Sequence, residues 1–367
     1  MYKKDNRIVA TLDAGGTNFV FGAMKAGEFI IDPVSVPAQS HDLDLCLQNM
    51  VNGFQQVFDK LDEKPVAISF AFPGPADYPN GIIGGYLPNF PSFRDGVALG
   101  AFLESKFGVP VFINNDGDLF AYGEALAGFL PEVNQTLQLN GVTRQYRNLL
   151  GITLGTGFGG GVVLDGVLLR GDNGCGGDVW CMRNERYPQM IAEEGVSIRA
   201  VRRVYQEESG QDVEGLTPYD IYQIAEGKRE GNPQAAKEAF RQLGEVAGEA
   251  MANALNIVDG VAVIGGGLAG AGKYILPGVV AALKGTAGTF GGNAFPILQM
   301  DVFNWEDEAD REKFVALGMG SVKVPCSDRE IPYLNRRSIC VGLSKNGAST
   351  SIMYGAYAYA LRQLDRL

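Results

Sequence analysis

Short apolar runs alternate with stretches of helical spacing over the first 128 residues. Gly27 and Glu28 are typical of a hairpin turn, so we expect antiparallel strands first, followed by strand–helix units with parallel strands. A helix is predicted over 42–62, with Ser40 as its N-cap. The other expected elements are strands at 7–12, 19–24, 29–36, 65–72 and 109–116 and helices at 97–107 and 117–128.

A similar order of elements is predicted in the rest of the chain. The expected elements are a strand–turn–strand unit over 148–171, helices at 190–209, 217–229, 233–256, 272–284 and 347–365, and strands at 258–267 and 295–302. Residues 131–148 are polar and predict an exposed loop or hairpin. Because a glycine-bearing hairpin followed by strand–helix units occurs twice, we expect two related α/β halves.

Glycine makes up 50 of the 367 residues, and it gathers in turns that follow buried strands, at 12–18, 154–161 and 263–269. Such turns let backbone N–H groups approach an anion, Thr17 adds a hydroxyl, and Asp13 can hold Mg²⁺ through water. The alternative for each turn is an ordinary tight hairpin. No turn has the GxxxxGK[ST] pattern, and the second turn returns into a strand, which disfavours a dinucleotide-binding fingerprint.

The distribution of glycine suggests where backbone would touch a nucleotide. Residues 151–177 and 260–292 together hold 22 of the 50 glycines. Glycine loses more conformational freedom on folding than any other residue, so a clustered excess often marks tight turns or backbone pressed against a ligand. We therefore expect these segments to flank a nucleotide site, with Gly15 and Gly16 facing it from the other half.

The strand predicted at 109–116 ends in a candidate catalytic carboxylate. Asp116 stands at the end of this strand, where ligands of open α/β sheets usually bind. A carboxylate there can accept a proton from a bound hydroxyl while Asn115 hydrogen-bonds neighbouring hydroxyls. The alternative is an Asx turn that caps the next helix. Asp118 is expected to fill that cap, which leaves Asp116 available for catalysis.

Charge and apolar patterning disfavour several classes of protein. A net charge of −11 disfavours binding to nucleic acid. No apolar run reaches the roughly 18–20 residues that span a membrane, and the first residues carry no export cleavage site, so we expect a cytoplasmic protein without a membrane partner. His41 is the sole histidine, and a Ser-His-Asp or Cys-His site, which would require it, is not expected.

The chain resembles the ROK family of sugar kinases and repressors, within the actin-like ATPase superfamily. The resemblance rests on segments in family order: LDAGGTN (12–18), FPGPADYPNGIIGGYLPNF (72–90), VFINNDGDLFAYGEALAG (111–128), GITLGTGFGGGVVLDGVLLRGDNGCGGDVW (151–180), VAVIGGG (261–267) and GASTSIMYGAYAYAL (347–361). It implies a two-lobed α/β fold of the actin-like ATPase (ribonuclease H-like) type, with a nucleotide and sugar cleft between the lobes. The smaller lobe is expected at 1–116, with the C-terminal helix 347–367 at or near it, and the larger lobe at 117–346.

By this resemblance the glycine turns bind ATP, and Asp116 is the catalytic base. The implied nucleotide-binding residues are Asp13, Gly15, Gly16, Thr17, Thr156, Gly157, Gly159, Gly266 and Gly267. The implied sugar-binding residues are Asn89, Asn115, Asp116, Asp178 and Glu193. The expected cofactors are ATP and Mg²⁺, with Mg²⁺ placed by Asp13 through water.

The chain departs from the family in a segment that binds sugar and zinc in other members. The family's Glu-x-Gly-His reads DVWC (178–181) here, and the later cysteine cluster is absent. Zinc needs about four N, S or O ligands, which Cys175 and Cys181 cannot supply alone, so no structural zinc is expected. Glu193 fits the family glutamate that contacts the sugar, and the adjacent Glu194 leaves this register open by one residue.

These features predict a glucokinase-like enzyme that uses ATP to phosphorylate a hydroxyl, expected to be the primary one, of a hexose or hexose derivative. One alternative is a sugar-sensing regulator of the same fold with weak catalysis, suggested by the changed 178–181 segment. Others are an actin-like ATPase with a protein client and a kinase with another donor, such as polyphosphate. Family repressors carry a helix-turn-helix before the first strand, for which 1–7 leaves no room, so direct DNA binding is not expected. The resemblance implies a homodimer.

Overall fold

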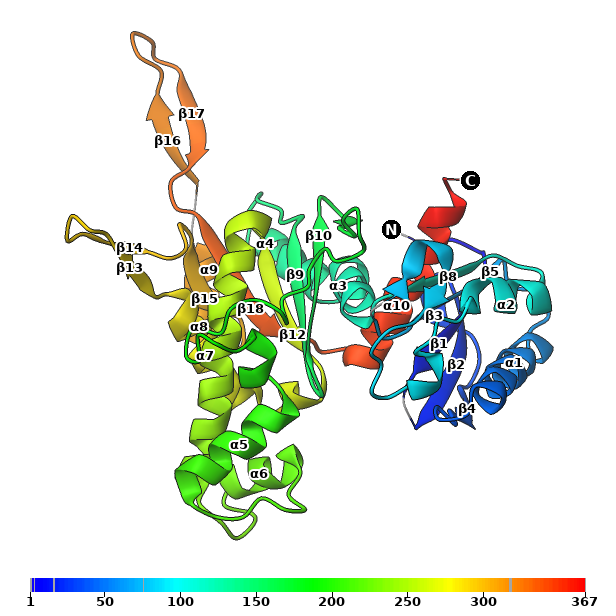
Figure 1. Ribbon diagram of the computed structural model, residues 1–367. Helices are drawn as coiled ribbons and strands as arrows, with labels where there is room; N and C mark the ends of the chain where they lie inside the picture. The colour runs from blue at the N-terminus through cyan, green and yellow to red at the C-terminus, as the bar shows by residue number, and fades with distance from the viewer. Residues whose placement is uncertain (1, 3, 16, 75, 317–318, 367) are drawn as a thin grey trace. The chain divides into compact units, whose positions relative to one another are not determined.

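The described part of the chain divides into two compact units, each built around its own mixed sheet (Figure 1). The computed structural model describes residues 2, 4–15, 17–74, 76–316 and 319–366. The first unit comprises Met1–Gly128, Val167–Gly176 and Asn346–Leu367, and the second comprises Phe129–Gly166 and Gly177–Lys345. The family resemblance led us to expect the division after residue 116. The contacts place it after Gly128, because helix α3 (Asp116–Ala127) packs on helix α10 (Ala348–Leu364) of the first unit.

The sheet of the first unit begins antiparallel and continues parallel, as predicted. Its strand order is β3-β2-β1-β5-β8, with β4 also paired to β2. Ala26 and Gly27 turn the chain between β2 and β3 with φ angles of 55° and 78°, the left-handed region that hairpin turns require. The strands are β1 (Val9–Ala14), β2 (Asn18–Lys25), β3 (Glu28–Phe29), β4 (Val34–Pro37), β5 (Ala67–Ala71) and β8 (Val111–Asn114).

Helices α1 (Leu43–Asp59) and α2 (Leu99–Phe107) contribute to an aromatic core in the first unit. The rings of Phe21 on β2 and Phe54 on α1 meet edge to face, with centroids 4.9 Å apart. A Cβ at Gly53 would lie 2.1 Å from the Phe21 ring, so only glycine allows this approach of helix to sheet. The N-cap of α1 is Asp42, whose side chain accepts the N–H of Leu45. The expected cap at Ser40 is therefore wrong by two residues.

The second unit repeats the pattern of hairpin and parallel strands, as the sequence predicted. The strands of its sheet that belong to this unit run in the order β10-β9-β12-β18-β15. β10 pairs antiparallel with β9, whereas β12 is parallel to both β9 and β18. The strands are β9 (Leu149–Leu154), β10 (Phe158–Leu164), β12 (Val261–Gly265), β15 (Asp301–Asn304) and β18 (Ser338–Leu343).

Helices surround this second sheet, and α7 (Pro233–Val258) packs extensively on α8 (Gly272–Leu283). Small residues permit the close approach, since a Cβ at Gly244 would lie 2.2 Å from the carbonyl oxygen of Ile275. The remaining helices of this unit are α4 (Phe129–Leu139), α5 (Ile198–Ser209), α6 (Pro218–Ala225) and α9 (Glu308–Ala316). Among the described residues, no helix has both the length and the apolar character needed to cross a membrane.

The polar segment 131–148 differs from its prediction in its first half, because helix α4 covers residues 131–139. Phe129, Val133 and Leu137 recur at helical spacing and are buried. Pro131 lies in the first turn, where its missing N–H costs no intrahelical hydrogen bond. The polar side chains lie on the other face of the helix, so the polar composition of the segment predicted a loop. Tyr146 then returns to the core, with its hydroxyl donating to the carbonyl of Ser338.

The segment after residue 284 also differs from the prediction. The strand expected at 295–302 is divided between the hairpin strand β14 (Ala294–Pro296) and the core strand β15. β14 pairs with β13 (Thr286–Gly288), and β16 (Met319–Lys323) pairs with β17 (Glu330–Leu334). Both hairpins extend beyond the rest of the second unit in Figure 1. The short elements are β6 (Ala76–Asp77), η1 (Tyr78–Asn80), β7 (Ile82–Ile83), η2 (Pro91–Phe93), β11 (Val167–Leu168), η3 (Ala192–Gly195) and η4 (Gly267–Ala271).

Candidate functional site

The first unit brings the candidate catalytic carboxylate and the candidate magnesium carboxylate to one edge of its sheet. Asp13, Ala71 and Asn114 are register partners across the parallel strands β1, β5 and β8. Asp116 follows β8 directly and begins helix α3. The carboxyl ends of parallel strands are the usual place for ligands in such sheets. Asp13 and Asp116 therefore lie where the sequence expected a site.

The electrostatic surroundings of Asp116 are those of a proton acceptor. Solvent reaches its side chain, yet the protein atoms crowded around it reduce its solvation. This desolvation raises the pKa of the Asp116 carboxyl, and the nearby Asp13 carboxylate raises it further, while hydrogen bonds from backbone N–H groups, including that of Gly117, lower it. A general base works best when its pKa approaches the working pH. The direction of the shift is therefore suited to proton abstraction.

The cap of helix α3 is filled by Asn115, and the expectation that Asp118 would fill it is wrong. The Asn115 side chain accepts the N–H of Gly117 at 2.8 Å, and Asp116 Oδ1 accepts the same N–H at 2.9 Å. Asp118 is 3% exposed and lies within the helix. Asn115 also donates to the hydroxyl of Tyr78 at 3.5 Å. The Asn115 amide thus has structural bonds in addition to its predicted role toward sugar hydroxyls.

Asn89 lies on an exposed loop of the first unit that is anchored on both sides. Leu87 and Phe90 are 2% and 1% exposed. The Phe90 ring stacks on Phe19 with centroids 6.1 Å apart and packs on Phe72 at 4.6 Å. Because Leu87 and Phe90 are buried, the exposed Asn89 is anchored on both sides. This presentation is compatible with its predicted contact to a sugar.

The turn between β1 and β2 contains the first predicted phosphate-binding segment. A Cβ at Gly15 would lie 2.8 Å from the carbonyl oxygen of Asn18, so the turn is tight enough to require glycine. Thr17 is exposed, and its carbonyl accepts the N–H of Ala38. Gly16 lies outside the described residues, so its predicted contact stays a prediction.

In the second unit, the turn between β9 and β10 is bonded to the candidate sugar-binding glutamate. Glu193 Oε2 accepts the N–H of Phe158 at 3.1 Å. A Cβ at Gly157 would lie 2.6 Å from the same carboxylate oxygen, so glycine at this position makes room for Glu193. Thr156 is exposed at the tip of the turn, and Gly159 follows it on β10. Glu193 and the predicted phosphate turn therefore form one local structure.

The third glycine turn follows β12 in the same unit. Gly266 has a φ of 90°, and a Cβ there would lie 2.3 Å from the carbonyl oxygen of Leu154 at the end of β9. The close approach to β9 therefore explains why this position is glycine. A Cβ at Gly267 would meet nothing within 4 Å, so backbone is accessible there. An accessible turn at a strand end leaves room for the predicted adenosine contact.

Part of the glycine excess has a purpose other than the predicted nucleotide contact. A Cβ at Gly160 would lie 2.4 Å from the carbonyl oxygen of Gly177, and one at Gly177 would lie 3.0 Å from the Cα of Gly161. These glycines let the segment that carries Asp178 cross β10 in backbone contact. Gly288 and Gly292 belong to the exposed β13–β14 hairpin. At Gly160 and Gly177 the close backbone packing accounts for glycine without a nucleotide, so the expected nucleotide contact stays a prediction there.

The segment after Asp178 folds into a closed loop that leads to Glu193. Arg183 and Ile191 form an isolated β-bridge across the loop. Asn184 is fully buried, accepts the N–H of Tyr187 at 2.9 Å, and donates to the carbonyl of Ile191 at 3.4 Å. A buried amide with both ends bonded fixes the loop internally.

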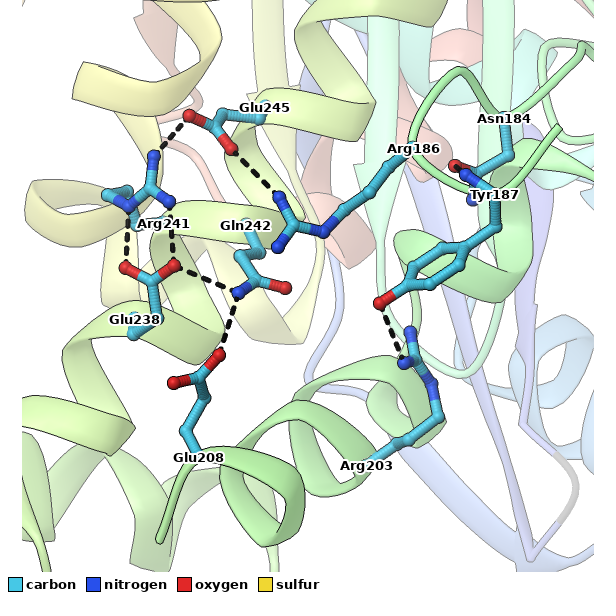
Figure 2. A network of polar contacts seen from close by, with 9 residues as sticks. All are labelled: Asn184, Arg186, Tyr187, Arg203, Glu208, Glu238, Arg241, Gln242 and Glu245. Carbon is cyan, nitrogen blue, oxygen red and sulfur yellow. Dashed lines mark hydrogen bonds and ion pairs between the residues drawn. The ribbon is translucent and has the colours of Figure 1, made fainter.

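Polar contacts attach this loop to the helices beneath it (Figure 2). Arg203 of α5 donates to the Tyr187 hydroxyl at 3.2 Å and lies over the ring, with its guanidinium carbon 4.8 Å from the centroid. The hydrogen bond from Arg203 lowers the pKa of Tyr187. Arg186 pairs with Glu245 of α7 at 3.7 Å, and Arg241 pairs with the same Glu245 (Figure 2). Side-chain contacts thus attach the loop at two helices.

The described residues include no group of three or more His, Cys, Asp or Glu side chains arranged to hold a metal ion. The expected absence of structural zinc stays a prediction. A water-mediated magnesium site is a different case, because Mg²⁺ keeps several waters and is usually bound by one or two carboxylates and substrate phosphates. Asp13 at the end of β1 is a suitable donor of this kind.

Sequence reasoning missed Arg199 and Tyr78. Arg199 donates to Glu193 at 3.2 Å and to Glu194 at 2.8 Å. Tyr78 is 7% exposed, and its hydroxyl donates to the carbonyl of Phe72 beside Asn115. Arg199 follows Glu194 and Glu193 by five and six residues, and this spacing is outside the i,i+3 and i,i+4 pairs that helical periodicity predicts. Tyr78 gave no signal either.

The two α/β units, each with a glycine turn between its first antiparallel strands, define the fold of the actin-like ATPase and hexokinase superfamily. This confirms the predicted fold class. The chain belongs to the ROK family, because residues 9–294 match the sequence profile of that family.

The chain is similar to sugar kinases from several bacteria. The crystal structure of a glucokinase from Parabacteroides distasonis is 56% identical in sequence, with 99% of each chain covered and a TM-score of 0.88. The glucokinase of Thermotoga maritima is 26% identical over 290 residues, which cover 72% of this chain and 83% of the relative. The N-acetyl-D-glucosamine kinase of Photobacterium profundum is 26% identical over 317 residues, which cover 77% and 97% respectively.

Proposed function

We propose that this protein is an ATP-dependent sugar kinase that phosphorylates a hydroxyl, expected to be the primary one, of a hexose or hexose derivative. The observation that carries the proposal is the position of Asp116 at the carboxyl end of β8, with its pKa raised by desolvation and by Asp13. Membership of the ROK family, with relatives that are glucokinases and an N-acetyl-D-glucosamine kinase, supports the same reaction.

Asp116 would accept the proton of the sugar hydroxyl as the hydroxyl oxygen bonds to the γ-phosphorus and the bond to the β-phosphate oxygen breaks. General base catalysis of this kind contributes about 10²–10⁴-fold. Asn89, Asn115, Asp178 and Glu193 would orient the sugar. Phosphoryl transfer depends mainly on positioning and charge stabilisation, which these polar side chains are suited to supply.

The phosphates would be held by backbone N–H groups of the glycine turns. The residues proposed for this role are Gly15, Gly16, Thr17, Thr156, Gly157, Gly159, Gly266 and Gly267. Asp13 would hold Mg²⁺ through water, and the ion would neutralise charge that develops on the phosphates. Asp13 fits this role because its carboxylate lies at the sheet edge, close enough to Asp116 to affect its pKa.

The first sugar to test is glucose, because the 56% identical relative is a glucokinase. The DVWC segment at 178–181 replaces the family's Glu-x-Gly-His, so N-acetylated hexosamines and epimers belong in the same panel. A ligand that binds the folded state raises the melting temperature by mass action. A melting-temperature screen of these sugars, followed by an ADP-release assay, would identify the substrate.

We expect Asp116→Asn to lower kcat by at least about 10²–10⁴-fold, because the amide cannot accept the hydroxyl proton. Nucleotide binding should remain, since the glycine turns are unchanged. The measurements are ADP release with the preferred sugar and calorimetric titration of a non-hydrolysable ATP analogue. Asp62→Asn, an exposed aspartate just after α1, is the matched control. Near wild-type turnover by Asp116→Asn would refute the assignment of the base.

A homodimer is part of this proposal, and exposed apolar side chains on the hairpins of the second unit support it. The largest exposed apolar residues there are Phe290, Phe295, Val322, Ile331, Tyr333 and Leu334. An isolated two-stranded hairpin is at best marginally stable in water. Packing against a second copy of the chain would cover these side chains and stabilise both hairpins.

A further inference from the structure

Arg199 occupies the first turn of α5, where it reaches acceptors from separate segments of the second unit. Its Nη2 donates to Glu193 Oε1 at 3.2 Å and to Glu194 Oε1 at 2.8 Å. Its Nη1 donates to the carbonyl oxygen of Thr156 at 3.4 Å. The guanidinium therefore bridges the predicted sugar-binding glutamate and the tip of the predicted phosphate turn.

The phosphate turn between β9 and β10 has further hydrogen bonds to the segment that carries Glu193. The N–H of Ile198, one residue before Arg199, donates to the carbonyl of Gly155 at 3.0 Å. Glu193 Oε2 accepts the N–H of Phe158 at 3.1 Å. Backbone groups at the start, tip and end of the turn are thus bonded to residues 193–199. The Arg199 side chain is the part of this attachment that also holds the other oxygen of the Glu193 carboxylate.

We infer that Arg199 is a positioning residue that ties the sugar-binding glutamate to the phosphate-binding turn. The inference rests on the proposed sugar-kinase function, because that proposal gives Glu193 and the glycine turn their substrates. Arg199 itself is assigned no contact with either substrate. A sugar hydroxyl that bonds to Glu193 would do so at a carboxylate already bonded to Phe158 and Arg199. A sugar bound to Glu193 therefore restrains the phosphate-binding turn, and phosphates bound to that turn restrain the Glu193 carboxylate in return.

Arginine is suited to this bridge because its planar guanidinium presents several N–H donors in fixed directions. One guanidinium can hold a carboxylate and a backbone carbonyl together, as it does here with Glu193 and Thr156. The ammonium of lysine carries the same charge but is a compact point donor on a flexible stem. Lysine at position 199 should therefore preserve the charge and only part of the positioning.

The test compares Arg199→Met and Arg199→Lys in the full-length protein. Arg199→Met should raise KM for the sugar and for ATP together and lower kcat/KM by about 10–100-fold, since small misplacements of binding groups have effects of this size. Arg199→Lys should recover part of the loss. Melting temperatures should stay close to wild type, because Arg199 is half exposed. Arg336→Met, which removes an exposed arginine paired with Asp301, is the matched control.

Two outcomes would overturn the inference. In one, both KM values are unchanged in Arg199→Met. In the other, kcat falls in proportion to a lower melting temperature and to a smaller folded fraction, which marks a purely structural role. A double-mutant cycle with Glu193→Gln sharpens the test. The effect of Glu193→Gln on kcat/KM should be smaller in the Arg199→Met background, whereas equal effects in both backgrounds would show that the side chains act independently.

Failure of the proposed function would be recognised separately. A wild-type protein that phosphorylates no sugar of the panel contradicts the kinase proposal itself. Calorimetric titration with a non-hydrolysable ATP analogue does not depend on turnover. Weaker binding of the analogue to Arg199→Met than to wild type supports the bridge to the phosphate turn in either case, and equal binding contradicts it.

Discussion

At the scale of single residues, two glutamates on α7 have opposite electrostatic surroundings. Burial raises the pKa of Glu249, and the carboxylates of Glu185 and Glu245 raise it further. Its Oε2 is buried, with no hydrogen-bond partner among the described residues. The hydrogen bonds from Arg241 lower the pKa of Glu238 to about 2. Ionisation of Glu249 therefore destabilises the folded state, whereas ionisation of Glu238 stabilises it.

We expect Glu249→Gln to stabilise the protein at neutral pH. With its raised pKa, the folded state keeps the Glu249 proton over a pH range where the unfolded chain has lost it, so stability falls as pH rises through the folded pKa. Glutamine does not ionise, so the variant does not lose stability in this way. Its gain in melting temperature should be present at pH 7–8 and vanish toward pH 4, as measured by thermal unfolding across that range.

Glu238→Gln is the control of opposite sign. The depressed pKa of Glu238 contributes stability that is present above its unfolded pKa and is lost as pH falls toward about 2. This variant should therefore lower the melting temperature at neutral pH. A pH-independent effect of either substitution would contradict the electrostatic explanation.

At the scale of elements, helices α3 and α10 are brought together by a reciprocal pair of glycines. A Cβ at Gly123 on α3 would lie 1.9 Å from the carbonyl oxygen of Ser351 on α10. A Cβ at Gly355 on α10 would lie 1.9 Å from the carbonyl oxygen of Leu119 on α3. The backbones are therefore in direct contact, and the position of α3, which begins at Asp116, depends on this contact.

Gly123→Ala and Gly355→Ala should each destabilise the protein by about 1–3 kcal/mol, because a methyl group would force the helices apart. Chemical denaturation would measure the loss. Turnover by the folded fraction should also fall, since α3 positions Asp116. Gly288→Ala is the control, because a Cβ there meets nothing within 4 Å. Wild-type stability in both helix variants would contradict this account of the packing.

At the scale of the whole molecule, the described chain combines a family-like body with hairpins that expose apolar side chains. The family profile covers 9–294, and the β16–β17 hairpin lies after that range. Phe295 and Tyr333 on the hairpins are 58% and 47% exposed. Contiguous exposed apolar surface commonly marks a protein interface.

We expect the protein to be a dimer that depends on these hairpins. Phe295→Ser combined with Tyr333→Ser should shift sedimentation toward the monomer, because the polar side chains remove apolar area from an interface that must bury about 1,200–2,000 Å². Tyr219→Ser removes an exposed aromatic residue on α6 and should leave the dimer intact. A wild-type monomer at micromolar concentration, or a double variant that dimerises normally, would contradict the proposal.

The sequence predicted the local elements well where periodicity and turn chemistry agreed. The β1–β2 and β9–β10 hairpins and the parallel strands β5, β8 and β12 lie where the pattern placed them. It failed at α4, where polar residues on the solvent face concealed a buried stripe that includes Val133 and Leu137. It also gave the cap of α1 to Ser40 instead of Asp42, because both side chains can cap and only the backbone geometry selects one.

The sequence by itself determined the kinds of chemistry available, because glycine turns and carboxylates at strand ends are set by residues close together in the chain. Only the tertiary structure decided how those groups are bonded. Glu193 lies 35 positions beyond Phe158, yet its carboxylate accepts the N–H of that residue. Gly123 and Ser351 likewise meet because two distant helices pack together. Such contacts depend on how each sheet and its helices assemble, and no local pattern encodes them.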